Sequence, residues 1–500
     1  MKPHDSLIRS AVTAAVLALI PFQLPASPLG DEPVSWTDER RAEARETWEE
    51  RIPGIIDDFR DWNEGFADGK AYSDRSDSAV LAWRQARVLH RYMQAFHITG
   101  DPYWLEIFVD QVDRMLDNRE RHPPEDAPGW GSARGVAEVR GTPLGDRQKS
   151  ILNPSLLRLR ALSDEGRAVT GHTYEAVFDE HNRLVVTDLT ESRVIEETDF
   201  ESPHELTAVP GTKFLIEGDP VPGEGFRIET VVPRQLQSVL HDGMITYPIA
   251  LFVEAALTAE AGSPAANYQD HARRYLEFLE SDVFKKWEPY WNDLSADSGN
   301  YRYSDDRTER FPGFLLHHNR YMTLGRTWLA LKDLPESEHG DVMEERVRKM
   351  TGYFKKHVRP NDNAWAWNFW DPGEGEELEV IRIEDMSHAA ITASFLVQAN
   401  YRSGAGVSRD DLRALSNTFV NVMWNGSLYR PRFAPYVARP PIHDFRSPTL
   451  ESFKRGGEWH ELARFDHRVW RLLEAAWKED PDRNLALDLA YTYTRIVDPE

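Results

Sequence analysis

The stretch at residues 311–331, FPGFLLHHNRYMTLGRTWLAL, constrains the fold most, because it predicts a helix that is buried on both sides. Tyr321, Leu324, Trp328 and Leu331 recur at three- and four-residue spacings, which places them on one helix face. Apolar residues also cover the opposite face, so both faces require burial. Imidazole, amide and guanidinium side chains precede the apolar run, which indicates an inner helix with a polar site at its mouth.

The same pattern, a helix buried all round followed by an amphipathic helix, repeats along the chain. The pairs lie at residues 80–96 and 104–115, 244–257 and 268–284, 321–331 and 342–358, 389–399 and 412–424, and 462–477 and 485–493. Such pairs suit a double ring in which the inner helices face the axis and the outer helices face water. The sequence therefore predicts an all-α fold, an (α/α)6 or (α/α)7 toroid or barrel; an open α-solenoid or an irregular helical bundle is the alternative.

One region departs from this helical pattern. Between residues 171 and 233, YEAVF, RLVVTDL, KFLIEG and FRIETVV read as short strands separated by Gly, Pro and Asp. We expect a small β-rich insertion that walls a cleft. The predicted division of the chain is a signal peptide at 1–27, the first helical pairs at 28–170, the insertion at 171–233, and the remaining pairs with most of the site at 234–500.

The first residues have the pattern of an export signal. Lys2 and Arg9 form a basic region, residues 11–20 are apolar but too short to span a bilayer, and small residues follow at 25–27. No later run is long and apolar enough for a membrane span. We therefore expect a secreted or periplasmic protein without membrane insertion.

Composition narrows the chemistry. The chain has no Cys, which excludes disulfides, thiolate metal sites and Cys nucleophiles. Its formal net charge of −24 argues against nucleic acid or an anionic membrane as the main partner. A local group of Arg and His can still reverse the sign inside a cleft, so an anionic ligand remains possible.

Polar residues gather immediately before each predicted buried helix. If the inner helices run in parallel, these groups converge at one end of the ring, where helix N-termini favour a carboxylate or oxyanion. Ordinary helix capping explains any one of them, but four equivalent groups favour a site. The groups are His241 with Asp242, residues 317–320, Glu384 with Asp385 and His388, and Trp459 with His460 and Glu461.

The loops that lead into these helices are rich in aromatic residues. Trp365, Trp367 and Trp370 stand two or three residues apart in NAWAWNFWDPG, outside any helical pattern. Aromatic residues in loops stack on sugars as well as fill cores. The loop at 291–307 is rich in oxygen ligands, but its spacing matches no EF-hand, so a solvated polar loop is the preferred interpretation and no metal is expected.

The motifs LLHHNRYMTLGR, WAWNFW, EDMSHAAI and GEWHELARFD, taken in this order, resemble the helix-entry motifs of secreted (α/α)-toroid polysaccharide lyases. The resemblance covers about residues 240–477 and points to enzymes that degrade polyuronates such as glucuronan and alginate. It implies cleavage of a 1,4-linked, anionic uronate polysaccharide by β-elimination, without a cofactor.

In that reaction the C6 carboxylate is neutralised, a base removes the C5 proton, and an acid protonates the leaving O4. By resemblance, His318 and Asn319 match the neutralising pair, in reversed order. His388 is the second candidate for neutraliser or base, and Tyr303 is the favoured phenol. The expected substrate-binding residues are Arg302, Arg320, His241, Tyr247, Tyr301, Trp365, Trp367, Glu384, Trp459 and His460.

Two other functions are compatible with the same residues. An inverting glycoside hydrolase needs two carboxylates across the cleft, for which Asp242, Glu384, Asp385 and Glu461 are available. A non-catalytic glycan-binding envelope protein needs only the aromatic loops, with the histidines acting as caps and core partners.

Overall fold

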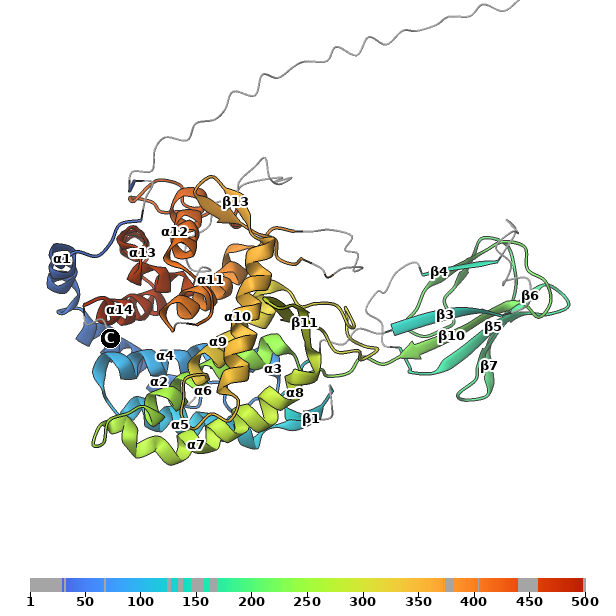
Figure 1. Cartoon of the computed structure of the whole chain (residues 1–500). Helices are drawn as coiled ribbons and strands as arrows, with labels where there is room; N and C mark the ends of the chain where they lie inside the picture. Colours follow the sequence, from blue (N-terminus) through green and yellow to red (C-terminus); the bar gives the residue numbers. More distant parts are fainter. Residues whose placement is uncertain are drawn as a thin grey trace, which may run out of the picture.

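The computed structural model (Figure 1) describes most of the chain after the N-terminal segment. The predicted signal peptide at 1–27 lies outside the described residues. In what is described, no helix has the length and apolar character needed to cross a membrane. The described residues are 29–30, 33–66, 69–123, 127–133, 138–144, 157–161, 169–371, 373, 382–402, 404–438 and 457–497.

Helices form one large body of the molecule. Their N-termini follow the rules of local capping: Asp385 and Asp466 accept hydrogen bonds from backbone N–H groups of α11 and α13, and Ser408 forms a capping box with Asp411 at α12. The α-helices are α1 Asp38–Trp48, α2 Ile52–Gly65, α3 Ser78–Val80, α4 Ala86–Thr99, α5 Tyr103–Asp117, α6 Val239–Leu257, α7 Gln269–Phe278, α8 Lys285–Trp287, α9 His318–Leu331, α10 Gly340–His357, α11 Met386–Tyr401, α12 Arg409–Asn417, α13 His467–Glu479 and α14 Arg483–Val497.

Short irregular helices continue several of these elements. Among the described residues, three of them have π-type hydrogen bonding and three are 3₁₀ helices. The π segments are η2 Leu81–Gln85, η5 Leu279–Phe284 and η7 Thr418–Met423; the 3₁₀ segments are η4 Pro264–Tyr268, η6 Glu288–Tyr290 and η9 Gly457–Arg464.

The inner helices pack in a cyclic order. α4 contacts α6, α6 contacts α9, α9 contacts α11, α11 contacts η9, η9 contacts α14, and α14 returns to α4. Most residues of α6 and α11 are buried, whereas α7 and α10 bury one face and expose charges on the other. α6 and α9 approach each other closely, because a Cβ on Gly243 would lie 2.3 Å from the Leu324 backbone nitrogen.

A second body consists of β-strands with a hydrophobic core of their own. One antiparallel sheet has the order β3-β10-β5-β6-β7, and a smaller one has the order β4-β9-β8. Alternate residues of β5 and β6 are buried, as expected for a sheet with one covered face. The strands are β3 Glu138–Leu144, β4 Arg158–Ala161, β5 Thr173–Phe178, β6 Arg183–Asp188, β7 Arg193–Asp199, β8 His204–Leu206, β9 Phe214–Glu217 and β10 Gly225–Val231.

This β domain projects from the helical body (Figure 1). The two chain segments that connect them run side by side, because Ser132 and Leu236 exchange backbone hydrogen bonds of 3.1 and 2.9 Å. The core of the β domain, which includes Tyr174, Phe178 and Phe226, is a hydrophobic cluster separate from that of the helices. Two strands, β3 and β4, precede residue 171, where the sequence analysis begins the β-rich insertion.

The prediction of an all-α toroid is wrong. The described residues contain five β-sheets, so the fold is a mixed α and β structure. Three of the sheets are two-stranded hairpins in connections that the sequence analysis treated as loops. Their short strands carry no clear two-residue alternation, so periodicity could not reveal them. These strands are β1 Glu120–His122 with β2 Ala127–Gly129, β11 Trp291–Ser295 with β12 Ser298–Tyr301, and β13 Arg359–Asn361 with β14 Ala364–Ala366.

Candidate functional site

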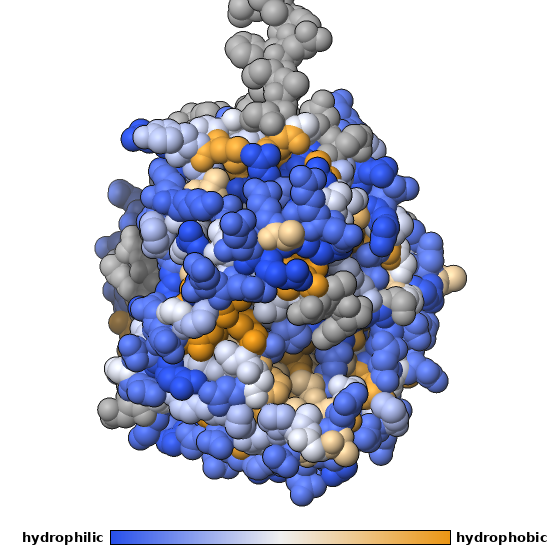
Figure 2. Space-filling model, turned by 90° about the vertical axis from the view of Figure 1, so that its left-hand side faces the viewer, coloured by the Kyte–Doolittle hydropathy of each residue, from blue (hydrophilic) through white to orange (hydrophobic). Residues whose placement is uncertain are grey.

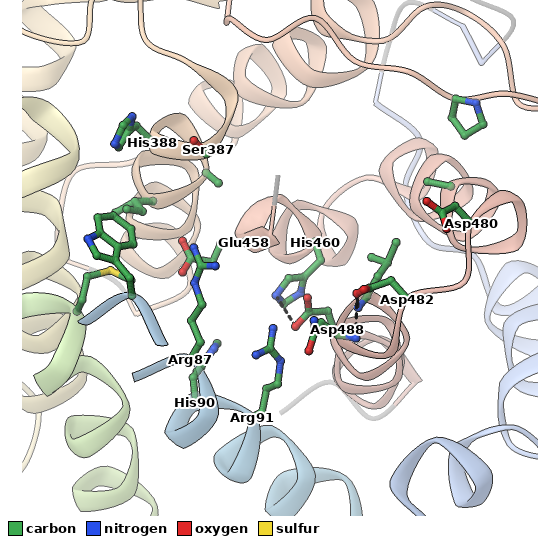
Figure 3. A pocket seen from close by; sticks show the side chains of 18 of the residues that line it. Arg87, His90, Arg91, Ser387, His388, Glu458, His460, Asp480, Asp482 and Asp488 are labelled. Carbon is green, nitrogen blue, oxygen red and sulfur yellow. Dashed lines mark hydrogen bonds and ion pairs between the residues drawn. The ribbon is translucent and has the colours of Figure 1, made fainter. Parts of the chain in front are cut away.

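A cavity of about 400 Å³ lies among the cyclically packed helices (Figure 3). Its lining comes from η2 and α4 on one side, from the start of α11, and from Glu458, His460 and the first turns of α14 on the other sides. The face of the helical body that carries α1 is mostly hydrophilic, with apolar residues in small patches (Figure 2). Polar side chains dominate the cavity too: Arg87, His90, Arg91, Ser387, His388, Glu458, His460, Glu479, Asp480, Asp482, Asn484 and Asp488.

Two guanidinium groups of α4 enter this cavity. Arg87 and Arg91 are four residues apart, so they project from the same helix face. In the described part of the chain, neither makes a hydrogen bond or an ion pair; Arg87 only lies over the Trp83 ring, 5.9 Å from its centroid. The buried Nε of Arg91 has no hydrogen-bond partner. Burial lowers the pKa of Arg91 below its usual value, with Asp488 partly offsetting this, yet an arginine remains charged at neutral pH.

The carboxylates around the cavity are, by contrast, already engaged. Glu458 pairs with the buried Arg326 at 3.3 Å, and Glu479 accepts hydrogen bonds from Arg432. Asp482 caps α14 by accepting from the backbone N–H of Asn484 and Leu485. Each of these three carboxylates already has a hydrogen-bond or ion-pair partner, whereas the two guanidinium groups have none in the described part of the chain.

Asp488 is occupied as well, since it accepts a hydrogen bond from Gln94 at 3.1 Å and lies 3.7 Å from Nε2 of His460. The other ring nitrogen of His460 pairs with the Thr492 hydroxyl at 2.9 Å. His90 is held neutral, because burial lowers its pKa to about 3 despite the opposing effect of Glu458. Burial alone would raise the pKa of Glu458, but Arg326, Arg87 and His90 outweigh it and the net pKa is lowered.

At the other wall of the cavity, His388 lies on the first turn of α11. Its Nδ1 pairs with the carboxylate of Asp385, which also accepts from the backbone N–H groups of Ser387 and His388. These contacts lower the pKa of Asp385 to about 2, although burial alone would raise it. Glu384 is fully buried beside them, and its pKa is raised well above the usual value, chiefly by burial and also by Asp385.

The imidazole and amide that the lyase resemblance singled out lie in the interior. His318 is fully buried, with Nδ1 2.9 Å from the Tyr321 hydroxyl and Nε2 3.0 Å from a carboxylate oxygen of Asp371. Burial lowers the pKa of His318, against the effect of Asp371. Asn319 is buried, and its amide atoms make no hydrogen bond in the described part of the chain.

Tyr303, the predicted phenol, is also buried, and its hydroxyl lies 2.8 Å from Nδ1 of His317. Arg320 stacks on the Tyr303 ring, 5.2 Å from its centroid, and Arg302 lies 3.9 Å from Asp305. Tyr303 and its neighbours are thus occupied with one another and do not line the 400 Å³ cavity.

The predicted substrate-binding residues are mostly core residues. His241 bonds to Ser78 at 2.8 Å, Tyr247 lies under the Arg326 guanidinium at 4.5 Å, and Tyr301 accepts from Trp328 at 3.3 Å. Trp367 and Trp459 are fully buried, and Trp365 is half-buried on β14.

Of all the predicted site residues, only His388 and His460 line the cavity. The sequence analysis missed Trp83, Arg87, His90 and Arg91, because it treated the helix at residues 80–96 as core. One signal was present: Arg87 and Arg91 stand four residues apart in a helix that is otherwise rich in apolar residues.

No family model and no curated protein matches the chain. Similar solved structures include FlgL of Xanthomonas campestris in two crystal forms and the flagellar junction protein FlgL of Legionella pneumophila. The identities are 10%, 13% and 11%, over 50%, 47% and 50% of this chain and 92%, 88% and 93% of theirs, with TM-scores of 0.15, 0.15 and 0.17. At such TM-scores no property of those proteins is carried over.

The resemblance to polysaccharide lyases is wrong, and with it the prediction of an enzyme that cleaves a uronate polysaccharide. The described fold is not all-α but contains five β-sheets, so it lacks the architecture that the resemblance implies. The physical reason is the burial of the proposed neutralising pair. Because His318 has no exposed surface and both its ring nitrogens are engaged, it cannot meet the C6 carboxylate of a polymer.

Proposed function

We propose that this protein binds an acidic saccharide without transforming it. The binding site is the cavity of about 400 Å³ lined by α4, called the α4 cavity below. The observation that carries the proposal is the pair Arg87 and Arg91, which lines a cavity and, in the described part of the chain, makes no hydrogen bond or ion pair with a carboxylate. Arg91 is half-buried, and a half-buried guanidinium without a direct partner is unfavourable, so an anionic ligand is the natural complement.

Carboxylate recognition fits these side chains well. The planar guanidinium donates two parallel hydrogen bonds to a carboxylate, which gives both strength and orientation. Trp83, one turn before Arg87, adds an aromatic surface for the apolar face of a sugar ring. The cavity of about 400 Å³ falls in the range of small-ligand sites, roughly 300–1,000 Å³, and suits one or two sugar units.

The state of the carboxyl groups supports binding rather than hydrolysis. A hydrolase needs a carboxylic acid that stays protonated and a free carboxylate opposite it. Glu458, which lines the cavity, is instead held ionised by Arg326, and Glu384, whose pKa is raised, does not line the cavity. Asp242 forms a buried ion pair with Lys286 at 2.6 Å, and Glu461 accepts from Ser394 and Gln398.

The proposal places the mature protein outside the cytoplasm. Its support is the basic, apolar and small-residue pattern of residues 1–27. A location in the periplasm or outside the cell would give the cavity access to acidic envelope or environmental glycans.

Calorimetric titration tests the proposal. A 1,4-linked glucuronic acid oligomer should bind, and a cello-oligomer of the same length, which lacks only the carboxylates, should bind at least tenfold more weakly. Ultraviolet absorbance and reducing ends should stay constant over hours. Equal affinity for both oligomers would reject carboxylate recognition, and product formation would reject a purely binding role.

A further inference from the structure

We propose that Glu384, Asp385 and His388 form a binding site for one divalent cation with the ligand preferences of Zn²⁺. One ligand atom from each residue lies within 4.8 Å of the other two. Ligands around a tetrahedral zinc at about 2.0–2.2 Å stand about 3.3–3.6 Å apart, so small side-chain rotations bring the three atoms to coordinating distance. This inference does not depend on the saccharide proposal.

Glu384 provides the observation that sets this cluster apart from an ordinary helix cap. Its side chain is fully buried, and neither carboxylate oxygen has a hydrogen-bond partner in the described part of the chain. The indole N–H of Trp367 is close enough to influence it but does not reach hydrogen-bond geometry. A buried carboxylate is normally paired with a cation or coordinates a metal, and here one oxygen faces an imidazole and a second carboxylate.

The neighbouring ligands are held in place by the start of α11. One oxygen of Asp385 accepts from the backbone N–H groups of Ser387 and His388, which leaves its second oxygen directed at the imidazole. His388 is further fixed by the Phe369 ring, with centroids 5.1 Å apart. Metal-binding side chains typically make additional contacts of this kind, which hold them in the orientation needed for the ion.

The donor set indicates the class of ion. One imidazole nitrogen with two carboxylate oxygens suits Zn²⁺ or Mn²⁺ better than Ca²⁺, which takes six to eight oxygens. Three protein ligands leave a coordination position open. That position would face the α4 cavity, since Ser387 and His388 line it.

A second cluster in the β domain serves as an internal control. His172, Asp188 and Glu191 are equally close together. There, however, Asp188 is saturated: one oxygen accepts from the backbone N–H groups of Thr190 and Glu191, and the other pairs with His172 at 2.8 Å. No buried carboxylate is left without a partner, so this cluster needs no cation.

The experiment uses the full chain, freed of metal by a chelator and titrated with ZnCl₂ in a phosphate-free buffer at neutral pH. The wild type should bind one equivalent. Glu384→Gln, which keeps the shape of the side chain, and His388→Ala should each weaken binding by about 10- to 100-fold or more. His172→Ala should leave the stoichiometry and affinity unchanged, and circular dichroism verifies that each variant is folded.

Three results would overturn the proposal: no zinc binding by the wild type, full affinity in folded Glu384→Gln, or loss of binding in His172→Ala. Tighter binding of CaCl₂ than of ZnCl₂ would reject the assigned donor set. Because no saccharide is present, failure here leaves the saccharide proposal standing, and failure of the saccharide titration leaves this one standing.

Discussion

Arg87 and Arg91 stand four residues apart on α4, project into one cavity, and in the described part of the chain neither is paired with a carboxylate. Arg326, in the same interior, is instead paired with Glu458 and stacked on Tyr247. The contrast separates a cation that is paired within the fold from two that we propose bind a ligand.

Stability measurements should reflect that contrast. Arg91→Leu removes a half-buried charge whose Nε has no partner, so the free energy of unfolding should stay the same or rise by about 0.5–2 kcal/mol. Arg326→Leu leaves Glu458 without its partner and should cost about 3–5 kcal/mol. Urea unfolding of both variants provides the comparison; a loss above about 1 kcal/mol in Arg91→Leu would mean that Arg91 has a structural role.

The close contact between α6 and α9 predicts that two Gly→Ala substitutions differ in their effect on stability. Gly243→Ala places a Cβ 2.3 Å from the backbone nitrogen of Leu324 and from Oγ1 of Thr323, so the helices must separate, at a cost of about 2–3 kcal/mol. Gly54→Ala, in α2, meets no atom within 4 Å and should be neutral or stabilising by up to about 1 kcal/mol. Thermal unfolding distinguishes them, and equal melting temperatures would argue against close packing of α6 on α9.

The β domain should be removable. Its core is separate, its two connections lie side by side at Ser132 and Leu236, and ion pairs such as Arg307–Glu229, 3.5 Å long and largely exposed, contribute little. Replacement of residues 134–234 by a short Gly-Ser linker should leave the helical body folded and its saccharide affinity within about threefold. An insoluble or molten product would show that the two bodies stabilise each other.

Acid should destabilise the protein through two histidines. Burial lowers the pKa of His90 to about 3 and that of His467 to about 4, against about 6.5 when unfolded. Between pH 6.5 and these values the unfolded state binds protons that the folded state does not, so stability is lost as pH falls, by up to about 1.4 kcal/mol per pH unit for each histidine. In urea titrations at several pH values, His90→Gln combined with His467→Gln should flatten the dependence; an unchanged slope would contradict the burial of both rings.

Sequence periodicity identified the long helices better than it identified the strands. Residues such as Tyr321 and Trp328 are fully buried on α9, as their spacing predicts. The three small hairpins were not predicted because three to five residues per strand are too few to show a two-residue alternation, and β3 and β4 were not predicted because they precede the region where the helical pattern visibly fades.

The site was harder to predict than the helices. A polar residue before a buried helix has the same appearance whether it faces a cavity, as His388 does, or the interior, as His318 does. The difference depends on tertiary partners such as Asp371, 53 residues away in the chain. Conversely, nothing local marks Arg91 as unpaired, because the absence of a partner is a property of the assembled fold.

The most direct test is a double-mutant cycle on the two cavity arginines, with calorimetric titration of the glucuronic acid oligomer. Arg87→Ala and Arg91→Ala should each weaken binding by tenfold or more, with a coupling between them because both hold one ligand, whereas Arg84→Ala, an exposed arginine on η2, should have no effect. Wild-type affinity in Arg87→Ala, Arg91→Ala and the double variant would contradict the account, since the acidic saccharide would then bind elsewhere or not through these charges.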